Sequence, residues 1–301
     1  MPFWRSVFAG GIAVVLLAAA PAAGEPGGTV HRFGVVNFYN PRLMYLKYQP
    51  LVDYLVEQTG LEWELVLSSS YEQTVVDLCA GRLDVAYLGP YTYARAHELC
   101  GAQPVVQLRT NGKLTYQGVI MVRTGSRIRG IPDLKGTRMG FGAPLSTSSH
   151  LVVRGMLARA GLQPGRDVAC RYFLHHDRAA RAVLLGEVEA CAVRDIVGEK
   201  FIQRGLRVLA ASDPISNFPL VISPGREPQL RGLLVDALVA VPGRDPKVKA
   251  EIAGWDEELA GGFSPCSDAD FESVRVLARQ VFGPLALTAP ESTFECSGGR
   301  P

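Results

Sequence analysis

The chain alternates short β-rich runs with helical patterns, and this alternation occurs in two separate series. The first series covers residues 33–108 and the second covers residues 131–210. Alternation of this kind is typical of parallel sheets that are covered by helices on both faces. Two apolar segments, 116–122 and 218–222, follow the two series. They suit a chain that crosses from one lobe into a second lobe and later returns.

Hydrophobic periodicity and helix-ending glycines predict the individual elements. In the first series we expect strands at 33–38, 63–67, 84–88 and 105–108, and helices at 43–59, 72–80 and 91–99. In the second we expect a short turn at 131–136, strands at 138–141, 168–173, 190–193 and 207–210, and helices at 148–160, 177–185 and 197–204. From residue 228 onward the pattern is mostly helical.

The predicted fold class is therefore α/β, with two lobes that each contain a sheet flanked by helices. Residues 24–120 and 219–301 are expected to form the first lobe and residues 121–218 the second, joined by a two-segment hinge. A chain of 301 residues is also long for a single hydrophobic core. The alternative is one large doubly wound sheet.

The first 23 residues have the pattern of a secretory signal peptide. A positive charge at Arg5 precedes an almost wholly apolar stretch at 7–20, and small residues follow at Ala22 and Ala23. A membrane anchor is the alternative, but the apolar run is shorter than the ~20 residues of a spanning helix. We therefore expect export and removal of residues 1–23.

Charge and cysteine content narrow the possible partners. A net charge of +2 argues against nucleic acid, which needs a clustered basic field. Six cysteines in an exported chain without a CxxC pair favour disulfides over metal ligands. The sequence does not choose among the possible pairings, but Cys79–Cys100, Cys170–Cys191 and Cys266–Cys296 would each stay within one lobe. No metal or cofactor is expected.

A run of hydroxyl residues follows the predicted strand at 138–141. Ser146, Thr147 and Ser148 lie where the next helix begins. The free backbone N–H groups and partial positive charge of a helix start favour an anion there. The alternative is a serine-rich helix cap, although a cap needs only one hydroxyl.

A histidine pair occupies the equivalent place one strand later. His175 and His176 follow the strand at 168–173 and precede a helix for which Asp177 is a plausible cap. Ligands of open α/β sheets bind at this carboxyl edge of the strands. His176 is therefore a candidate ligand, with a structural histidine as the alternative.

Several motifs in order resemble the periplasmic binding components of phosphonate and phosphite ABC importers. The resemblance runs from about Phe33 to Ser223, and the following segments carry it: 84–90, 133–136, 144–148, 176–177, 186–193 and 214–219. It implies a type II periplasmic binding fold, a periplasmic location, a small oxyanion ligand and a permease partner. A monomer is expected.

The resemblance also implies site residues. In that family a Ser-Thr-Ser loop and a histidine hold the phosphonate oxygens, and these positions are here Ser146, Thr147, Ser148 and His176. Aromatic positions of the family resemble Tyr71, Tyr116, and Tyr91 or Tyr93, although a tyrosine is often only a core residue. A protonated His176 would make affinity weaken as pH rises through its ordinary pKa of ~6.5.

This chain departs from the family pattern at two places. Ser149 stands where the family usually has glycine, and residues 216–218 contain no carboxylate. The second departure puts an aminoalkyl phosphonate in doubt and leaves phosphite, a simple phosphonate or another oxyanion. The alternative function is that of a sensor that reports an oxyanion to a membrane histidine kinase. Relatives of the family sense arsenite in this way, and they use a thiol to do so.

An exported enzyme is the remaining class. The chain contains neither GxSxG nor HExxH, and the glycines at 140 and 142 lack the third glycine of a dinucleotide motif. Ser146, His176 and Asp177 suggest a triad, but adjacent histidine and aspartate cannot easily place the carboxylate on the far ring nitrogen. We therefore expect a binding protein without catalytic residues.

Overall fold

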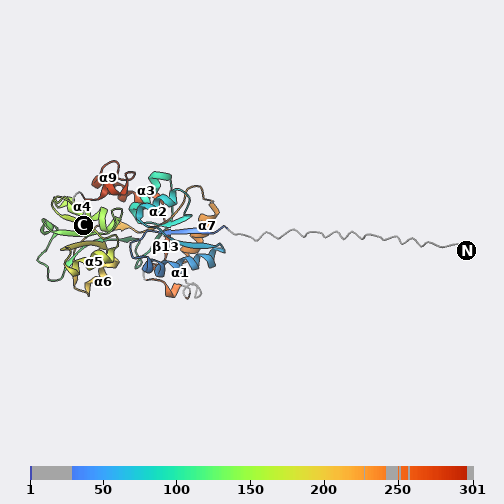
Figure 1. Cartoon of the computed structure of the whole chain (residues 1–301), viewed down its shortest axis with the longest axis horizontal. Helices are drawn as coiled ribbons and strands as arrows, with labels where there is room; N and C mark the ends of the chain where they lie inside the picture. The colour runs from blue at the N-terminus through green and yellow to red at the C-terminus, as the bar shows by residue number, and fades with distance from the viewer. Residues whose placement is uncertain (2–28, 227, 242–249, 251, 257, 297–301) are drawn as a thin grey trace.

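The molecule has two lobes that lie side by side, as the computed structural model shows in Figure 1. The structure describes residue 1 and residues 29–226, 228–241, 250, 252–256 and 258–296. The predicted signal peptide thus falls almost wholly outside the described residues. Within the described part, no helix combines the length and apolar character that a bilayer crossing requires.

Lobe I is the part built on a six-stranded sheet of order β13-β4-β12-β3-β1-β2. Its strands are β1 (His31–Val35), β2 (Trp63–Leu67), β3 (Val85–Tyr87), β4 (Gln103–Leu108), β12 (Pro219–Ile222) and β13 (Phe263–Pro265). Its helices are α1 (Pro41–Thr59), α2 (Tyr71–Cys79), α3 (Pro90–Cys100) and α7 (Pro228–Val239). The bounds of α1 have a local cause: Asn40 accepts from the Leu43 N–H at 3.1 Å, and Gly60 ends the helix in the left-handed region.

Lobe II is the part built on a five-stranded sheet of order β10-β6-β9-β7-β8. Its strands are β6 (Gly118–Arg123), β7 (Arg138–Phe141), β8 (Ala169–Tyr172), β9 (Ala190–Arg194) and β10 (Leu206–Ala211). It also contains a 3-10 turn η1 (Ile131–Leu134), one π-helical turn η2 (Thr147–Leu151), and helices α4 (Val152–Arg159), α5 (His176–Leu185) and α6 (Asp195–Ile202). The two-lobed α/β prediction is confirmed.

Both sheets are mixed, because the crossing strands, and β13 in lobe I, run against the parallel strands of the βα units. Strand β12 is antiparallel to both β3 and β4, and β6 is antiparallel to both β9 and β10. The strands of the βα units stay parallel, as β1 with β2 and β3, and β7 with β8 and β9. Each crossing strand enters its sheet from the other lobe, at the edge where the parallel strands end. It therefore has to run against them.

The hinge between the lobes is a short two-stranded sheet. Strand β5 (Thr115–Tyr116) pairs with β11 (Ile215–Ser216), with Tyr116 opposite Ile215. Strand β6 already begins at Gly118, so the crossing into lobe II starts a little before the predicted boundary at residue 120. An added Cβ at Gly118 would lie 2.4 Å from the Ser148 carbonyl oxygen, so only glycine fits beside the hydroxyl loop.

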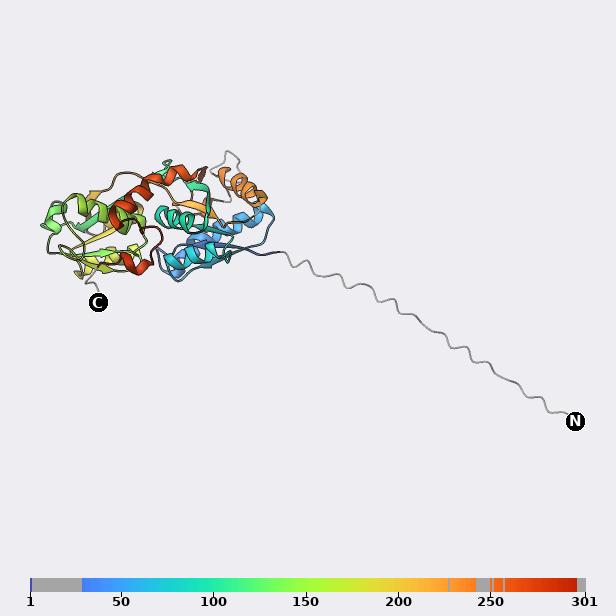
Figure 2. The ribbon, with the colours of Figure 1, turned by 90° about the horizontal axis from the view of Figure 1, so that it is seen from above.

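The last part of the chain connects the lobes a third time. Helix α9 (Glu272–Phe282) packs against α3 of lobe I and α4 of lobe II. After it, the Ala286 carbonyl accepts from lobe I at Tyr91, whereas the Phe294 carbonyl accepts from lobe II at Arg154. Figure 2 shows this red segment lying across both lobes. The sequence predicts this segment in the first lobe alone and predicts no strand at the position of β13.

Two disulfides are present in the described residues. Cys79–Cys100 joins α2 to α3 and confirms one predicted pair. The predicted pairs 170–191 and 266–296 are wrong, because Cys170 of β8 is bonded to Cys296 and both Cys191 and Cys266 are free thiols. The sequence-local pairing failed because the C-terminal segment returns to lobe II. This second disulfide therefore closes a loop that runs through both lobes.

The two disulfides should differ in their contribution to stability. Cys170–Cys296 spans 126 residues and Cys79–Cys100 spans 21. Loop-closure entropy then gives about 5 and about 3 kcal/mol. We expect the double change of Cys170 and Cys296 to serine to lower the free energy of unfolding in urea more than the same change at Cys79 and Cys100. An equal or smaller loss would contradict the chain-entropy account.

Candidate functional site

The hydroxyl loop between β7 and α4 is held by its own side chains. Ser146 caps η2, accepting from the Ser149 N–H at 3.3 Å, while the Ser149 hydroxyl accepts from the Gly142 N–H at 3.1 Å. A Cβ at Gly142 would lie 2.5 Å from the Ser149 hydroxyl and 2.9 Å from the His176 ring. Ser149, which stands where the family usually has glycine, therefore stabilises the loop itself. Ser146 caps the helical turn, and its hydroxyl also lies against the His176 ring.

His176 is the first residue of α5, and its ring is fixed from both sides. Its Nδ1 accepts from the backbone N–H of Arg194 at 3.1 Å, so the ring proton lies on Nε2, 3.2 Å from the Ser146 hydroxyl. Burial, followed by the charges of Arg194 and His175, lowers the pKa of His176 to about 3. The ring is thus neutral at physiological pH and presents one N–H donor.

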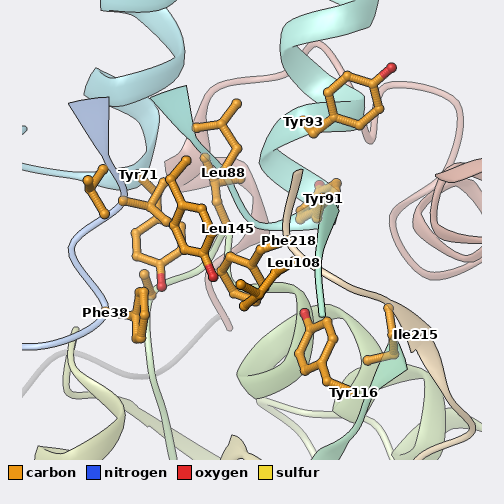
Figure 3. Packing of buried hydrophobic residues seen from close by; sticks show 14 of the residues in the cluster. Phe38, Tyr71, Leu88, Tyr91, Tyr93, Leu108, Tyr116, Leu145, Ile215 and Phe218 are labelled. Carbon is orange, nitrogen blue, oxygen red and sulfur yellow. The ribbon is translucent and has the colours of Figure 1, made fainter. Parts of the chain in front are cut away.

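Thr147 joins this loop to lobe I. Its hydroxyl oxygen accepts from the backbone N–H of Tyr91 at 2.9 Å, where α3 begins. The Tyr91 side chain points elsewhere, since its hydroxyl donates to the Ala286 carbonyl at 2.7 Å and its ring packs on Phe282. Tyr91 is a predicted site residue, but the structure brings only its backbone N–H to the loop, and its hydroxyl lies elsewhere. Tyr93 donates to Asp268 and points away (Figure 3).

The other two predicted tyrosines lie against the loop. The Tyr71 hydroxyl lies beside that of Ser146, and the Tyr116 hydroxyl lies beside those of Thr147 and Ser148. Burial raises the pKa of both phenols above its usual range, so both remain O–H donors. The Tyr116 hydroxyl is buried, and it makes no hydrogen bond of normal geometry with any described residue. An unsatisfied buried hydroxyl of this kind is costly unless a ligand oxygen meets it.

We call six of these residues the donor cluster: Tyr71, Tyr116, Ser146, Thr147, Ser148 and His176. Tyr71 comes from lobe I, Tyr116 from the hinge, and the other four from lobe II. None of the six is more than 3% exposed, so a ligand reaches them only when the lobes separate. Sequence reasoning chose all six, and the structure brings all six together.

Four helices begin at the donor cluster, and their starts add positive potential. Tyr71 is the first residue of α2, Thr147 of η2 and His176 of α5, while Tyr91 is the second residue of α3. Each follows the carboxyl end of a parallel strand, which is where the two lobes meet. Helix starts carry partial positive charge. The site therefore offers neutral donors in a positive field, which suits a compact oxyanion.

The contact between Ser146 and His176 resembles a nucleophile–base pair but cannot act as one. A base would need a free lone pair on Nε2, whereas the Arg194 N–H occupies Nδ1 and leaves the proton on Nε2. Asp177 does not supply the missing carboxylate, since Nδ1 of His176 is already occupied by the Arg194 N–H and the Asp177 Oδ1 makes no hydrogen bond among the described residues. No group of metal-ligating side chains occurs in the described part of the chain.

Sequence reasoning missed the charged group beneath the donor cluster. Arg194 is fully buried at the end of β9 and pairs with Glu258 of lobe I. The only local signal was an arginine that ends an apolar strand. Glu258 lies in the stretch that had been predicted as mostly helical, and nothing in its sequence surroundings points to the site.

Known proteins share this architecture. A phosphate-import protein, PhnD, from Mycolicibacterium smegmatis is 28% identical over 256 residues, which cover 76% of this chain and 78% of that protein. The binding component of an ABC phosphonate transporter from Pseudomonas aeruginosa superposes with a TM-score of 0.76 at 20% identity, covering 87% of this chain and 90% of that one. PhnD1 of Prochlorococcus marinus, solved with methylphosphonate, gives 0.74 at 17% identity, covering 84% and 98%.

These structures establish the fold, a type II periplasmic binding fold, and the family rests on the sequence. The family described as the periplasmic substrate-binding protein of phosphonate ABC transporters matches residues 33–271, most of the chain. The alternative of an arsenite sensor receives no support from these comparisons. The chain belongs to the family of periplasmic substrate-binding proteins of phosphonate ABC transporters.

Proposed function

We propose that this protein captures a small tetrahedral oxyanion, a phosphonate or phosphite, between its lobes and delivers it to the permease of an ABC importer. The observation that carries the proposal is the donor cluster, in which hydroxyls from lobe I, the hinge and lobe II meet one neutral imidazole N–H. The relative from Mycolicibacterium smegmatis is named for phosphate import, and the Prochlorococcus marinus protein was solved with methylphosphonate, so both names point to a tetrahedral oxyanion.

Closure of the lobes is the mechanism. The oxyanion first meets Ser146, Thr147, Ser148 and His176 on lobe II, and Tyr71 completes the site when lobe I approaches. Each hydrogen bond to a charged oxygen contributes ~1.5–3 kcal/mol net. Four or five such bonds give a gross ~6–15 kcal/mol, from which closure and ordering costs are subtracted, and micromolar binding needs ~8 kcal/mol. No arginine or lysine has to touch the ligand.

We also propose that the protein is not an enzyme and that it acts in the periplasm. With the imidazole proton on Nε2, the Ser146–His176 contact supports binding and not hydrolysis. We further propose that the protein is monomeric and that residues 1–23 are removed during export to the periplasm. N-terminal sequencing from the native host would refute the last point if Met1 were retained.

The first prediction concerns the donors. Alanine at Ser146, Thr147 or His176 should weaken binding of methylphosphonate or phosphite ten- to a hundredfold, the loss of ~1.5–3 kcal/mol. Isothermal calorimetry measures this change. Ser223→Ala is the matched control, because Ser223 is a buried serine of lobe I that donates to the Leu78 carbonyl at 2.8 Å. It should lower stability but leave affinity intact. Unchanged affinity in Thr147→Ala and His176→Ala would remove both from the site.

The second prediction concerns pH. A pKa of about 3 keeps His176 neutral from pH 5 to 8, so its contribution to binding should not vary over that range. The ratio of the Kd of His176→Gln to that of the native protein cancels the titration of the ligand itself. We expect this ratio to be constant. A ratio that grows as pH falls towards 5 would show that a protonated ring holds the anion.

The third prediction concerns amine selectivity. Two nearby carboxylates already have partners: Asp195 accepts from the Gln117 N–H at 2.8 Å, and Glu258 pairs with Arg194. Burial and the neighbouring Glu72 raise the pKa of Glu291, near Tyr71, to about 7, so it is only partly charged. Aminoethylphosphonate should therefore bind no more than about tenfold better than methylphosphonate, or ~1.4 kcal/mol. A hundredfold preference in calorimetry would assign the amine to Glu291.

A further inference from the structure

Arg194 lies directly behind the donor cluster in an aromatic enclosure. It ends β9 of lobe II, and none of its surface is exposed. Its guanidinium carbon lies 4.7 Å from the centre of the Tyr116 ring and 4.4 Å from that of Phe218. Both rings belong to the hinge region. The guanidinium thus fixes the Tyr116 ring by cation–π contacts that burial strengthens.

The closer of two counter-charges of Arg194 comes from the opposite lobe, while Asp195 of its own lobe lies 3.9 Å from its Nε. Glu258 of lobe I pairs with its Nη1 and also accepts from the Tyr87 hydroxyl at 3.0 Å. On the hinge side, the Asn217 amide oxygen accepts from Nη2 at 3.1 Å. Glu258 is only 1% exposed. Because the cation is on lobe II and the anion on lobe I, this buried pair exists only while the lobes are together.

The backbone of the same residue sets the state of the histidine. The Arg194 N–H donates to Nδ1 of His176, which leaves the proton on Nε2, towards Ser146. Arg194 therefore contacts Tyr116 through its side chain, His176 through its backbone and Glu258 across the interface. No other residue described above links two members of the donor cluster to the opposite lobe in this way.

We propose that Arg194 is a positioning residue that couples ligand capture to lobe closure, with Glu258 as its partner. The proposal rests on the proposed function and adds the group that transmits closure to the site. When the lobes close, the pair forms and the Tyr116 and His176 donors are held in place. When they open, the pair separates and water reaches both ions.

The energetics of buried pairs make this coupling measurable. A buried pair is seldom a large net gain, because desolvation offsets the attraction, but removal of one partner leaves a buried charge uncompensated. The closed state would then be strongly disfavoured. Each lobe would stay folded, since opening lets water reach the lone charge. Replacement of both partners by apolar residues removes the uncompensated charge and should restore closure.

The experiment compares Glu258→Gln, Arg194→Met and the double variant Arg194→Met with Glu258→Met. Stopped-flow and calorimetry with methylphosphonate give dissociation rates and affinities. We expect each single variant to bind about a hundredfold more weakly, mainly through faster dissociation, and the double variant to return to within about tenfold of the native protein. The melting temperature without ligand should change little in the single variants, which a purely structural role would not allow.

The matched control is an ion pair inside one lobe. Arg138 and Glu189 of lobe II lie 2.6 Å apart and are exposed, so Glu189→Gln should leave the dissociation rate unchanged. Native affinity in both single variants at the Arg194–Glu258 pair would overturn the proposal. So would a double variant as weak as the singles, because Arg194 would then act without its partner.

Small-angle X-ray scattering separates failure of this proposal from failure of the proposed function. If the native protein bound no oxyanion, the proposed function would fail, yet closure could still be compared without ligand. A larger radius of gyration in Glu258→Gln, reversed in the double variant, would support the coupling. Equal radii in all three proteins would overturn it.

Discussion

The crossing of the chain between the lobes is the constraint on which the site depends. Strands β6 and β12 each enter a sheet from the opposite lobe and run antiparallel to both of their neighbours. The parallel strands of each lobe consequently end facing the other lobe. The loops that follow β2, β3, β7 and β8 then start their helices at one place, where the donor cluster lies.

Once these helix starts meet, the proposed function needs only neutral groups to bind an anion. The phenols keep their protons because burial raises their pKa, and His176 stays neutral because burial lowers its pKa. A buried cation touching the ligand would favour any anion strongly. Hydroxyl and imidazole donors stabilise only ligands whose oxygens lie at hydrogen-bonding positions. Arg194, whose backbone N–H contacts His176, has its charge compensated by Glu258. Selectivity then depends on shape and on the number of oxygens.

The lobes are joined by more than the hinge. The C-terminal segment contacts α3 of lobe I through Ala286 and is bonded to β8 of lobe II through Cys296. A hinge motion has to bend or lift this segment, because residues 286 and 296 are held by different lobes. The chain between them spans at most ~3.6 Å per residue. The opening of the lobes at this side is limited accordingly.

Sequence periodicity by itself determined much of this protein. Strands 63–67 and 138–141 were predicted with their observed bounds, and the two-lobed class followed from two βα series and two crossing segments. All six members of the donor cluster were chosen from the sequence, His176 and the hydroxyl loop by their place after a strand and the tyrosines by family resemblance. These inferences succeed because hydrophobic period and helix-start chemistry are local.

Only the tertiary structure decided the features that join distant parts of the chain. The pairing of Cys170 with Cys296, the ion pair of Arg194 with Glu258 and the antiparallel crossing strands all depend on where the C-terminal part and the second lobe return in space. The roles of Tyr91 and His176 were decided there too. The Tyr91 hydroxyl is drawn to the Ala286 carbonyl, and the Arg194 N–H sets the histidine tautomer. Local sequence patterns do not indicate such partners, because contacts between residues that are tens to hundreds of positions apart leave no periodic signal.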